Sequence, residues 1–391
     1  MPVNFQKIRK DIEKMGMDAI NREKVISERC DDANVLITQY CDKFVEVNQL
    51  IDRVVAKNSW FRCARPTVEL MNDKFDSPTL LVYPLIIAAD GSQIIPSRHD
   101  AVQFGLINIG VFRIQTGSGK TPEVSYDSEL IFGDALYQDG YMVGEDFISL
   151  KRDLAERQAL NKAIRLEENK TVIALTDGQL ELFRGESKEN ARFNQVFNQY
   201  LEALRELSVT GAITAGYVDR PRADLVVRML ELLVTADPEK VNAERPFEGV
   251  SDFNVFSRIL KPGQRSAIFE IQSGSSASYS DELALHFFYL NVGRENKPWI
   301  ARIEIPRWVA VNEQKVKILQ AALLEQCRRM GLSAYPYCLH RAHEIAVVDR
   351  DQKAEIEGMI ISEMIRQGLT PGETSYKQAA KDLPGRTRLE R

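Results

Sequence analysis

Residues 80–92, LLVYPLIIAADGS, form a hydrophobic run that ends on an acid and a glycine. A second run, VIALTDG at residues 172–178, ends in the same way. Runs this apolar predict buried strands, and each strand then delivers a carboxylate, Asp90 or Asp177, to its carboxyl end beside a Gly turn. Carboxylates brought to one edge of a sheet are suitable ligands for divalent metal ions. Metal-dependent chemistry is therefore the leading hypothesis.

Asp-Gly is also a common turn dipeptide, favoured wherever the backbone needs a positive φ angle. Taken alone, either copy fits this plain turn interpretation. Two copies, each after a strongly apolar strand, leave both interpretations open, so the rest of the chain has to decide between them.

The composition of the 391 residues, 44% hydrophobic and 27% charged, is ordinary for a soluble globular protein. No apolar run approaches the about 20 residues of a membrane span, and the amino terminus lacks a signal-peptide core, so we expect a cytoplasmic protein without a membrane partner. Five cysteines with no close pairs argue against a disulfide framework or a zinc ribbon. The net charge of −5 excludes a simple basic DNA-coating protein, but clustered acids around a metal site also lower the charge of a nuclease.

Residues 4–58 are helical in pattern and form the first predicted region. Within it, apolar side chains follow a three-four spacing over almost three heptads, at Ile37, Tyr40, Phe44, Val47, Ile51 and Val54. The spacing predicts either a helix packed on the core or a coiled-coil or hairpin contact for dimerisation.

The pattern changes near Ser59, and residues 59–367 are predicted to form one α/β domain. After the first strand come strands over 101–115 and 123–132, joined at GSGKT (117–121), which fails as a phosphate-binding loop because Ile114 replaces its first Gly. We interpret that stretch as a hairpin turn. Further elements are predicted in this order: helix 149–168, strand 172–177, helix 192–207, strand 212–218, helix 222–234, an irregular stretch 237–262, strands 266–272, 283–292 and 299–305, helix 311–331, a short strand or loop 335–339, helix 349–367 and a flexible charged tail 368–391.

The order strand, hairpin, helix, strand, helix, strand, starting with a strand that carries Asp, is that of an RNase H-like (Piwi-like) α/β fold. In that fold an antiparallel meander is continued by parallel strands, which gives a mixed sheet with flanking helices. A two-metal nuclease site there needs several oxygen ligands around two cations. Asp90 and Asp177 supply two of them from neighbouring strands, and a third is expected from helix 149–168, where the candidates are Asp153, Glu156, Glu167 and Glu168.

Glu156 has a plain alternative as a solvated acid paired with Arg152 one turn earlier. The last candidate is His343, because an imidazole ligates metals or moves protons near neutral pH. His340 competes for that role, and the spacing of the two histidines also suggests a zinc pair, which no cysteine pair or third ligand supports.

With these motifs the sequence resembles the NurA nucleases of archaea and bacteria. The resemblance rests on six motifs in the family's order: AADGSQ (88–93) followed by PSRH (96–99), Arg152-x-x-x-Glu156, ALTDG (174–178), AGYVDRP (215–221), ARIEIPRW (301–308) and AHE (342–344).

The resemblance implies an RNase H-like fold and a manganese-dependent DNA nuclease, with Mg²⁺ as an alternative ion, that has 5′-to-3′ exonuclease and single-strand endonuclease activity. It implies a homodimer docked on a hexameric DNA-translocating ATPase, HerA, in double-strand-break end resection. By motif, Asp90, Glu156 and Asp177 match the metal-binding acids and His343 the active-site histidine. A family tyrosine matches either Tyr335 or Tyr337.

Two features depart from the family pattern. Gln179 replaces an expected Ser after the second Asp-Gly, and the amino-terminal helices look longer than the minimal pattern. The first leaves the ligand intact. The second leaves the geometry of dimer and ATPase docking open.

Other residues carry two interpretations each. Glu304 is either a fourth acid, with Arg302 and Arg307 beside it, or part of a strand-edge salt bridge. Three cations (Arg258, Lys261 and Arg265) are either a basic lip for DNA or scattered surface charges, and Trp299 and Trp308 either stack on single-stranded bases or belong to the core. Two further hypotheses for the whole chain are a non-catalytic adaptor of a ring ATPase and an RNA-directed RNase H-like enzyme.

Overall fold

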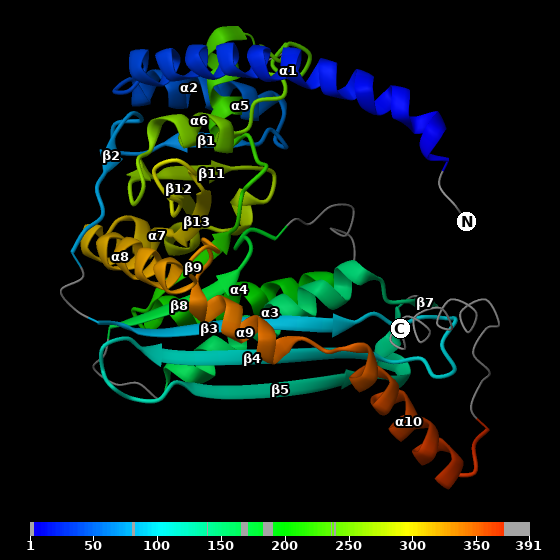
Figure 1. Ribbon diagram of the computed structural model, residues 1–391. Helices are drawn as coiled ribbons and strands as arrows, with labels where there is room; N and C mark the ends of the chain where they lie inside the picture. Colours follow the sequence, from blue (N-terminus) through cyan, green and yellow to red (C-terminus); the bar gives the residue numbers. More distant parts are fainter. Residues whose placement is uncertain are drawn as a thin grey trace. The chain divides into compact units, whose positions relative to one another are not determined.

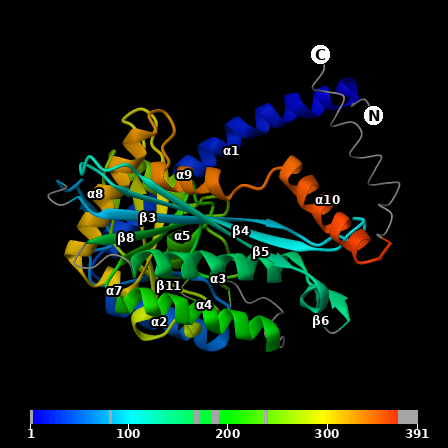
Figure 2. The same cartoon turned by 90° about the horizontal axis from the view of Figure 1, so that it is seen from below.

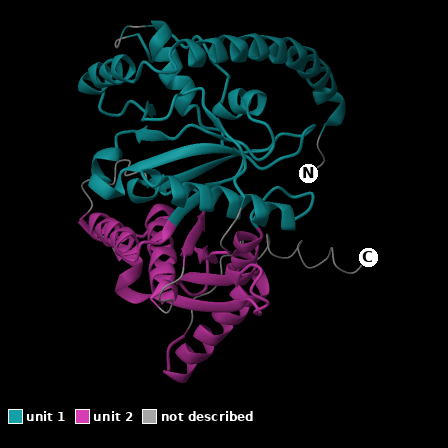
Figure 3. Cartoon of the chain, turned by 90° about the vertical axis from the view of Figure 1, so that its left-hand side faces the viewer, with its two compact units in different colours: residues 1–82, 178–183, 214–336 teal, residues 83–177, 184–213, 337–391 magenta. Residues whose placement is uncertain are grey.

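The structure, a computed structural model, describes residues 4–79, 83–138, 140–165, 171–182, 191–235, 237 and 240–370. The chain forms two compact units (Figure 3). Unit 1 comprises residues 1–82, 178–183 and 214–336, and unit 2 comprises residues 83–177, 184–213 and 337–391. The predicted division into 1–58, 59–367 and 368–391 stays a prediction, and most of the predicted tail, 371–391, lies outside the described residues.

Unit 2 is built on the predicted meander. Strands β3 (Leu85–Ile94), β4 (Gly105–Gln115) and β5 (Glu123–Ile131) pair antiparallel, and β8 (Val172–Asp177) pairs parallel with β3. The glycines of the predicted hairpin turn, Gly117 and Gly119, both have positive φ angles between β4 and β5. A central strand is buried on both faces, which explains why residues 85–89 are uniformly apolar.

One prediction about β3 was wrong, because the strand does not end at Asp90. Gly91 continues the ladder opposite Ile109, and the pairing with β4 runs on to Ile94. The strand also begins at Leu85 rather than at residue 80, directly after Pro84, which has no N–H to donate to a ladder. Asp90 therefore lies inside the sheet, and the turn interpretation of Asp-Gly does not apply to it. Residues 80–82 lie outside the described part of the chain.

Helices cover both faces of the sheet of unit 2. On one face, α3 (Glu145–Ile164) packs against β3 and β4, and α4 (Ala191–Val209) packs against α3 (Figure 2). On the other face, α9 (Tyr337–Ala346) crosses β3 and β4 (Figure 1). Residues 335–339 were expected to be a short strand or loop, so this prediction was wrong: the segment 337–346 is too short for its helical period to stand out.

Unit 1 contains an antiparallel array of five strands. They are, in spatial order, β1 (Cys63–Pro66), β11 (Phe269–Gln272), β12 (Leu285–Asn291), β13 (Ile300–Pro306) and β9 (Ile213–Val218). The segment 237–262, expected to be irregular, contains α6 (Asp252–Ile259), whose start is fixed by a capping box between Ser251 and Asn254.

The amino-terminal region is two helices, α1 (Phe5–Gln39) and α2 (Phe44–Lys57), so the predicted apolar seam is interrupted at residues 40–43. Ile37 on α1 and Val47, Ile51 and Val54 on α2 are all buried. Helix α2 packs against β1 and α5 (Leu225–Thr235). The seam residues thus pack within unit 1, while dimerisation through this region stays a prediction.

The remaining elements are short or peripheral. In unit 1 they are β2 (Lys74–Phe75), β10 (Arg265–Ser266), α7 (Arg307–Ala310) and α8 (Glu313–Arg329); in unit 2 they are β6 (Tyr137–Gln138), β7 (Tyr141–Met142) and α10 (Arg350–Arg366). Single-turn 3₁₀ helices lie at Gly133–Leu136, Ser276–Ser278 and Asp281–Leu283. Among the described helices, we find none long and apolar enough to span a membrane.

The core of unit 1 contains a buried acid that predicts a pH dependence of stability. Asp252 accepts hydrogen bonds from the amides of Val226 and Val227, at 3.0 and 2.9 Å, and from the Tyr289 hydroxyl at 2.5 Å. Burial raises the pKa of Asp252 from 3.8 to about 6, although these hydrogen bonds oppose the shift. The folded state therefore binds the proton more tightly than the unfolded state does, and stability falls as the pH rises from about 4 to about 6.

We expect the free energy of unfolding to fall by about 3 kcal/mol over this pH range, because each unit of pKa difference between the folded and unfolded states corresponds to about 1.4 kcal/mol. Asp252→Asn should remove it, and urea unfolding from pH 4 to pH 7.5 measures the effect as the difference between wild type and variant. Glu46→Gln, which changes an exposed acid of α2, is the control. A difference between wild type and Asp252→Asn that stays constant with pH would contradict the prediction.

Candidate active site

Strand register places the two predicted acids side by side in unit 2. The last paired residues of the parallel strands β3 and β8 are Ala89 and Thr176, so Asp90 and Asp177 follow one position further on. Partners in a ladder point to the same face, and neighbouring strands lie about 4.8 Å apart. The two carboxylates thus start from adjacent backbone positions. Asp177 is exposed at the end of β8, and Gly178 after it has a φ angle of +84°, as the turn interpretation expects there.

The side chain of Asp90 meets His343 on the face that α9 covers. Nδ1 of His343 lies 2.7 Å from Oδ2 of Asp90. Asp90 is almost completely buried, whereas the His343 side chain is 62% exposed. When Asp90 is ionised its carboxylate only accepts hydrogen bonds, so Nδ1 of His343 is then the donor, and Nε2 of a neutral ring is left as an acceptor.

A glycine opposite Asp90 allows this contact. Gly110 is the cross-strand partner of Asp90, and a Cβ atom on it would lie 2.6 Å from the carbonyl oxygen of Ala342 and 2.7 Å from the amide of Ala346. The backbone of α9 therefore rests directly on β4. Ser92 and Asn108 both donate hydrogen bonds to the carbonyl of Ala346, which fixes the end of the helix.

Glu156 approaches from α3, on the opposite face of the sheet. Its side chain is 5% exposed, so Glu156 is not a solvated acid, although the pairing with Arg152 that the alternative expected is present. Its carboxylate bonds Arg157 at 3.0 Å and lies 3.6 Å from Nε of Arg152. Burial raises the pKa of Glu156 to about 8; the two arginines oppose this shift, and the charges of Asp153 and Asp90 add to it.

Strand β3 runs on beyond the end of its parallel neighbour β8. Strand β3 continues to Ile94, but β8 stops at Asp177, next to Asp90. Beyond that point β8 no longer separates the two faces beside β3. Asp90 therefore lies beside the end of β8.

The structure gives less support to the other acids of the predicted helix 149–168 as metal ligands. Asp153 is half-buried and bonds Nη2 of Arg152 at 2.9 Å. Glu167 and Glu168 lie outside the described residues. Of the two tyrosines, Tyr337 lies on α9 with His343, its ring against Phe112, whereas Tyr335 belongs to unit 1 and its ring contacts Tyr217.

Divalent metal ligation was tested against these positions. Within the part of the chain that the structure describes, no three His, Cys, Asp or Glu side chains stand close enough to hold a metal ion. The donors are nevertheless of the kind that Mg²⁺ and Mn²⁺ prefer, because carboxylate oxygens come from β3, α3 and β8 of one unit. Two of these carboxylates already have partners in the protein. Asp90 contacts the ring of His343, and Glu156 contacts Arg152 and Arg157. The residues fit a hard cation once the arginines release Glu156, because Asp90 can keep Oδ2 on His343 and offer Oδ1 to the ion.

Sequence reasoning missed Gly110, although a glycine inside an otherwise apolar strand is a known sign of close backbone approach. It also missed the buried pair of Arg157 and Tyr200, in which the guanidinium lies 5.5 Å from the ring centroid. No spacing rule connects those two residues, which lie on α3 and α4.

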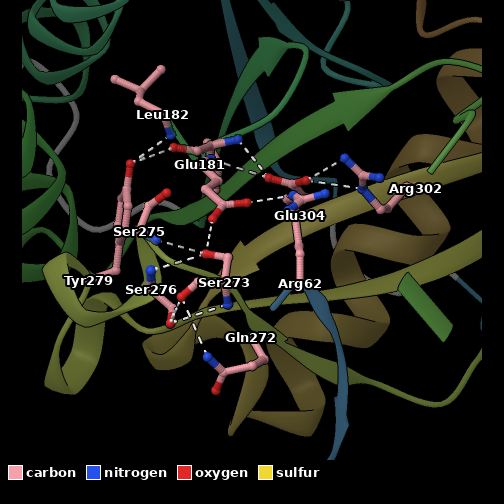
Figure 4. A network of polar contacts seen from close by, with 11 residues as sticks. Arg62, Glu181, Leu182, Gln272, Ser273, Ser275, Ser276, Tyr279, Arg302 and Glu304 are labelled. Carbon is pink, nitrogen blue, oxygen red and sulfur yellow. Dashed lines mark hydrogen bonds and ion pairs between the residues drawn. The ribbon is translucent and has the colours of Figure 1, made fainter. Parts of the chain in front are cut away.

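Glu304 lies in a separate polar network of unit 1 (Figure 4). Glu304 is fully buried on β13. Its Oε1 lies 3.0 Å from Nε and 2.7 Å from Nη2 of Arg302, and its Oε2 accepts a hydrogen bond from the backbone amide of Leu180 at 2.8 Å. Strand β13 pairs with β12 on one side and with β9 on the other, so the predicted salt bridge exists but not at a sheet edge. Its neighbour Glu181 bonds Arg62 at 2.5 Å and also bonds Ser273. Glu304 thus supports the segment that follows Asp177.

The predicted basic lip is wrong for one member. Arg265 is buried and makes two hydrogen bonds to Glu69, at 2.8 and 2.9 Å. Arg258 pairs with Asp31 at 3.3 Å, and Lys261 is exposed. Trp299 is half-buried and donates to Asp219 at 2.6 Å. Base stacking by Trp299 or Trp308 stays a prediction.

A three-stranded meander, a parallel fourth strand and acids on the first and fourth strands define the RNase H-like class of α/β folds. The sequence model of the NurA domain matches residues 84–348. The chain belongs to the NurA family.

Solved structures are similar over nearly the whole chain. The NurA nuclease from Sulfolobus solfataricus is 12% identical with a TM-score of 0.53, over 94% of this chain and 98% of that one. A crystal structure of NurA with manganese is 12% identical over 83% and 98% with a TM-score of 0.35. Endonuclease V from Ciona intestinalis, in complex with DNA, is 11% identical over 81% and 99% with a TM-score of 0.33. At these identities the Sulfolobus likeness shows the fold, and the two lower scores carry no argument. No curated protein matches the chain.

Proposed function

We propose that this protein is a metal-dependent DNA nuclease that hydrolyses phosphodiester bonds at the end of β8. The observation that carries the proposal is the 2.7 Å contact between Asp90 and His343, one strand away from Asp177. A buried carboxylate that orients an exposed imidazole, beside a second acid, is an arrangement for moving protons at a reacting centre.

Asp90, Glu156 and Asp177 would hold the cations, Mn²⁺ or Mg²⁺, as a two-ion site. A bound divalent ion supplies an activated water and neutralises charge on the phosphate. Asp90 keeps His343 in the tautomer with the proton on Nδ1. Nε2 then accepts a proton from the attacking water or, once protonated, donates to a phosphate oxygen. Tyr337, six residues before His343 on α9, is our choice for the family tyrosine.

Family membership supports a proposal for the finer activities. We propose 5′-to-3′ exonuclease and single-strand endonuclease activity in double-strand-break end resection, as a cytoplasmic homodimer with a hexameric ATPase of the HerA type. The long α1 supports a partner role for the amino-terminal region, because Phe5, Ile12 and Met15 are exposed apolar side chains along it.

The test is cleavage of 5′-labelled single- and double-stranded DNA with manganese, magnesium or EDTA. We expect cleavage with a divalent ion, none with EDTA, and a loss of about 10³-fold in Asp177→Asn, because one anionic ligand is removed. Asp127→Asn, an exposed acid of β5 in the same unit, is the matched control and should cleave normally.

Activity without a metal, or normal cleavage by Asp177→Asn, would contradict the proposed chemistry. If DNA stays intact under every condition, the assay is repeated with a HerA-type ATPase added. Binding to the ATPase without cleavage would favour the adaptor hypothesis. The same assay with RNA decides the substrate.

A further inference from the structure

Arg152 occupies a place that exists only because residue 91 is glycine. A Cβ atom on Gly91 would lie 2.5 Å from Cγ and 3.0 Å from Cδ of Arg152. Gly91 follows Asp90 within a continuous strand, so this glycine provides space rather than a turn. The aliphatic stem of Arg152 thus lies directly on the backbone of β3 next to Asp90, and its guanidinium reaches Asp153 and Glu156 on α3.

Three carboxylates act on that guanidinium. Nη2 of Arg152 bonds Asp153 at 2.9 Å, and Nε lies 3.6 Å from Glu156. Burial alone works to lower the pKa of Arg152, but the charges of Asp153 and Glu156, and then that of Asp90, raise it. The interaction is mutual, so Arg152 also favours the ionised forms of the acids around it.

Two arginines, Arg152 and Arg157, contact the carboxylate of Glu156, and their side chains differ in burial. The side chain of Arg157 is 2% exposed and lies against Tyr200, so it cannot leave without uncovering a buried charge. The side chain of Arg152 is 30% exposed. Arg152 can therefore turn its guanidinium into solvent while its stem keeps contact with the backbone of β3.

We propose that Arg152 is the internal counter-ion of Asp153 and Glu156, and that a divalent cation bound at Glu156 displaces its guanidinium. It is a positioning residue, which holds the carboxylates together before the metal binds and competes with it. The inference rests on the proposed function, because it assumes that Glu156 binds the cation. The measured affinity for the metal ion is then the difference between two binding free energies at the same acids, that of the ion and that of the Arg152 guanidinium.

Arg152→Met tests the competition, because Met keeps an unbranched stem over Gly91 and removes the charge. Calorimetric titration with MnCl₂ alone, without DNA, should give a dissociation constant about ten-fold lower than that of wild type, since a like charge near the ion is lost. Thermal unfolding in EDTA should show a lower midpoint for the variant, because the acids have lost their counter-ion. Added manganese should then raise that midpoint by more than it does in wild type.

Lys151→Met is the matched control. It removes the same charge from the adjacent position of α3, where Lys151 pairs with Glu129 of β5 at 2.5 Å, and should leave manganese affinity unchanged. Gly91→Ala is the second variant, which pushes the stem of Arg152 away while keeping its charge, and should also tighten manganese binding.

The outcomes separate the two proposals. If wild type binds manganese and Arg152→Met binds it equally or more weakly, Arg152 is no competitor and the inference is overturned. If wild type binds no manganese, the proposed metal site fails, and the inference fails with it. Tighter binding in both Arg152→Met and Gly91→Ala, but not in Lys151→Met, supports the inference.

Discussion

Asp90→Asn is expected to lower the rate of DNA cleavage by about 10³-fold or more while the protein stays folded. The amide has the size of the carboxylate and its oxygen still accepts the Nδ1 proton of His343, so packing on β3 is kept. It lacks the negative charge that a divalent cation needs and that stabilises the imidazolium when Nε2 takes up a proton. One substitution thus removes both functions of Asp90.

The measurement is single-turnover cleavage of 5′-labelled DNA at saturating manganese, with thermal unfolding of the same sample as a check on folding. His343→Asn should also cleave slowly. The double variant should be little slower than Asp90→Asn alone, because the two side chains act as a unit. Multiplicative losses in the double variant would show that Asp90 and His343 act independently. Cleavage near the wild-type rate by Asp90→Asn would refute the assignment of the site.

Gly110→Ala is the second change with a large expected effect, because the added methyl group meets backbone rather than flexible side chains. Its Cβ would lie 2.6 Å from the carbonyl oxygen of Ala342 and 2.7 Å from the amide of Ala346, so α9 has to move. We expect a loss of about 3 kcal/mol in the free energy of unfolding, as for other overpacked interiors. Because α9 carries His343, cleavage should fall by about 10²-fold as well.

The same strand provides the control for this prediction. Gly105 begins β4, and a Cβ atom there meets its nearest neighbours at 3.4 Å, which is ordinary contact. Gly105→Ala makes the same chemical change and should cost less than about 1 kcal/mol. Urea unfolding and cleavage are measured for both variants. Equal stability of the two would mean that α9 does not rest on Gly110 as closely as the structure shows.

The fold class could be predicted because its signals are local. Continuous apolar stretches at 85–89 and 172–175 are typical of strands buried on both faces, and Leu150, Leu154, Leu160 and Ile164 mark one face of α3. The order of these elements then leaves few topologies. The same signals failed for α9 and α6, because a helix of eight to ten residues shows less than three turns of its period.

The candidate site was predictable only as a set of residue types. Asp90 and Asp177 are visible in the sequence because each follows an apolar run, and His343 lies in a motif that resembles the family's. That Asp90 lies within β3, faces α9 and binds His343 depends on the register with Gly110, which is 20 residues away in the chain. Nothing in the local sequence reports that register.

What the sequence by itself determined is the set of buried strands and amphipathic helices, and with them the class of fold and the acids that it carries. The tertiary structure alone decided how deeply these charges are buried and which parts of the chain they support. Glu156 is buried between two arginines rather than solvated, and Glu304 supports a backbone segment of unit 1 rather than joining the acids of unit 2. The physical reason is range: hydrophobic period and helix capping depend on neighbours in the chain, whereas long-range hydrogen bonds, desolvation and charge pairing depend on what lies nearby in space.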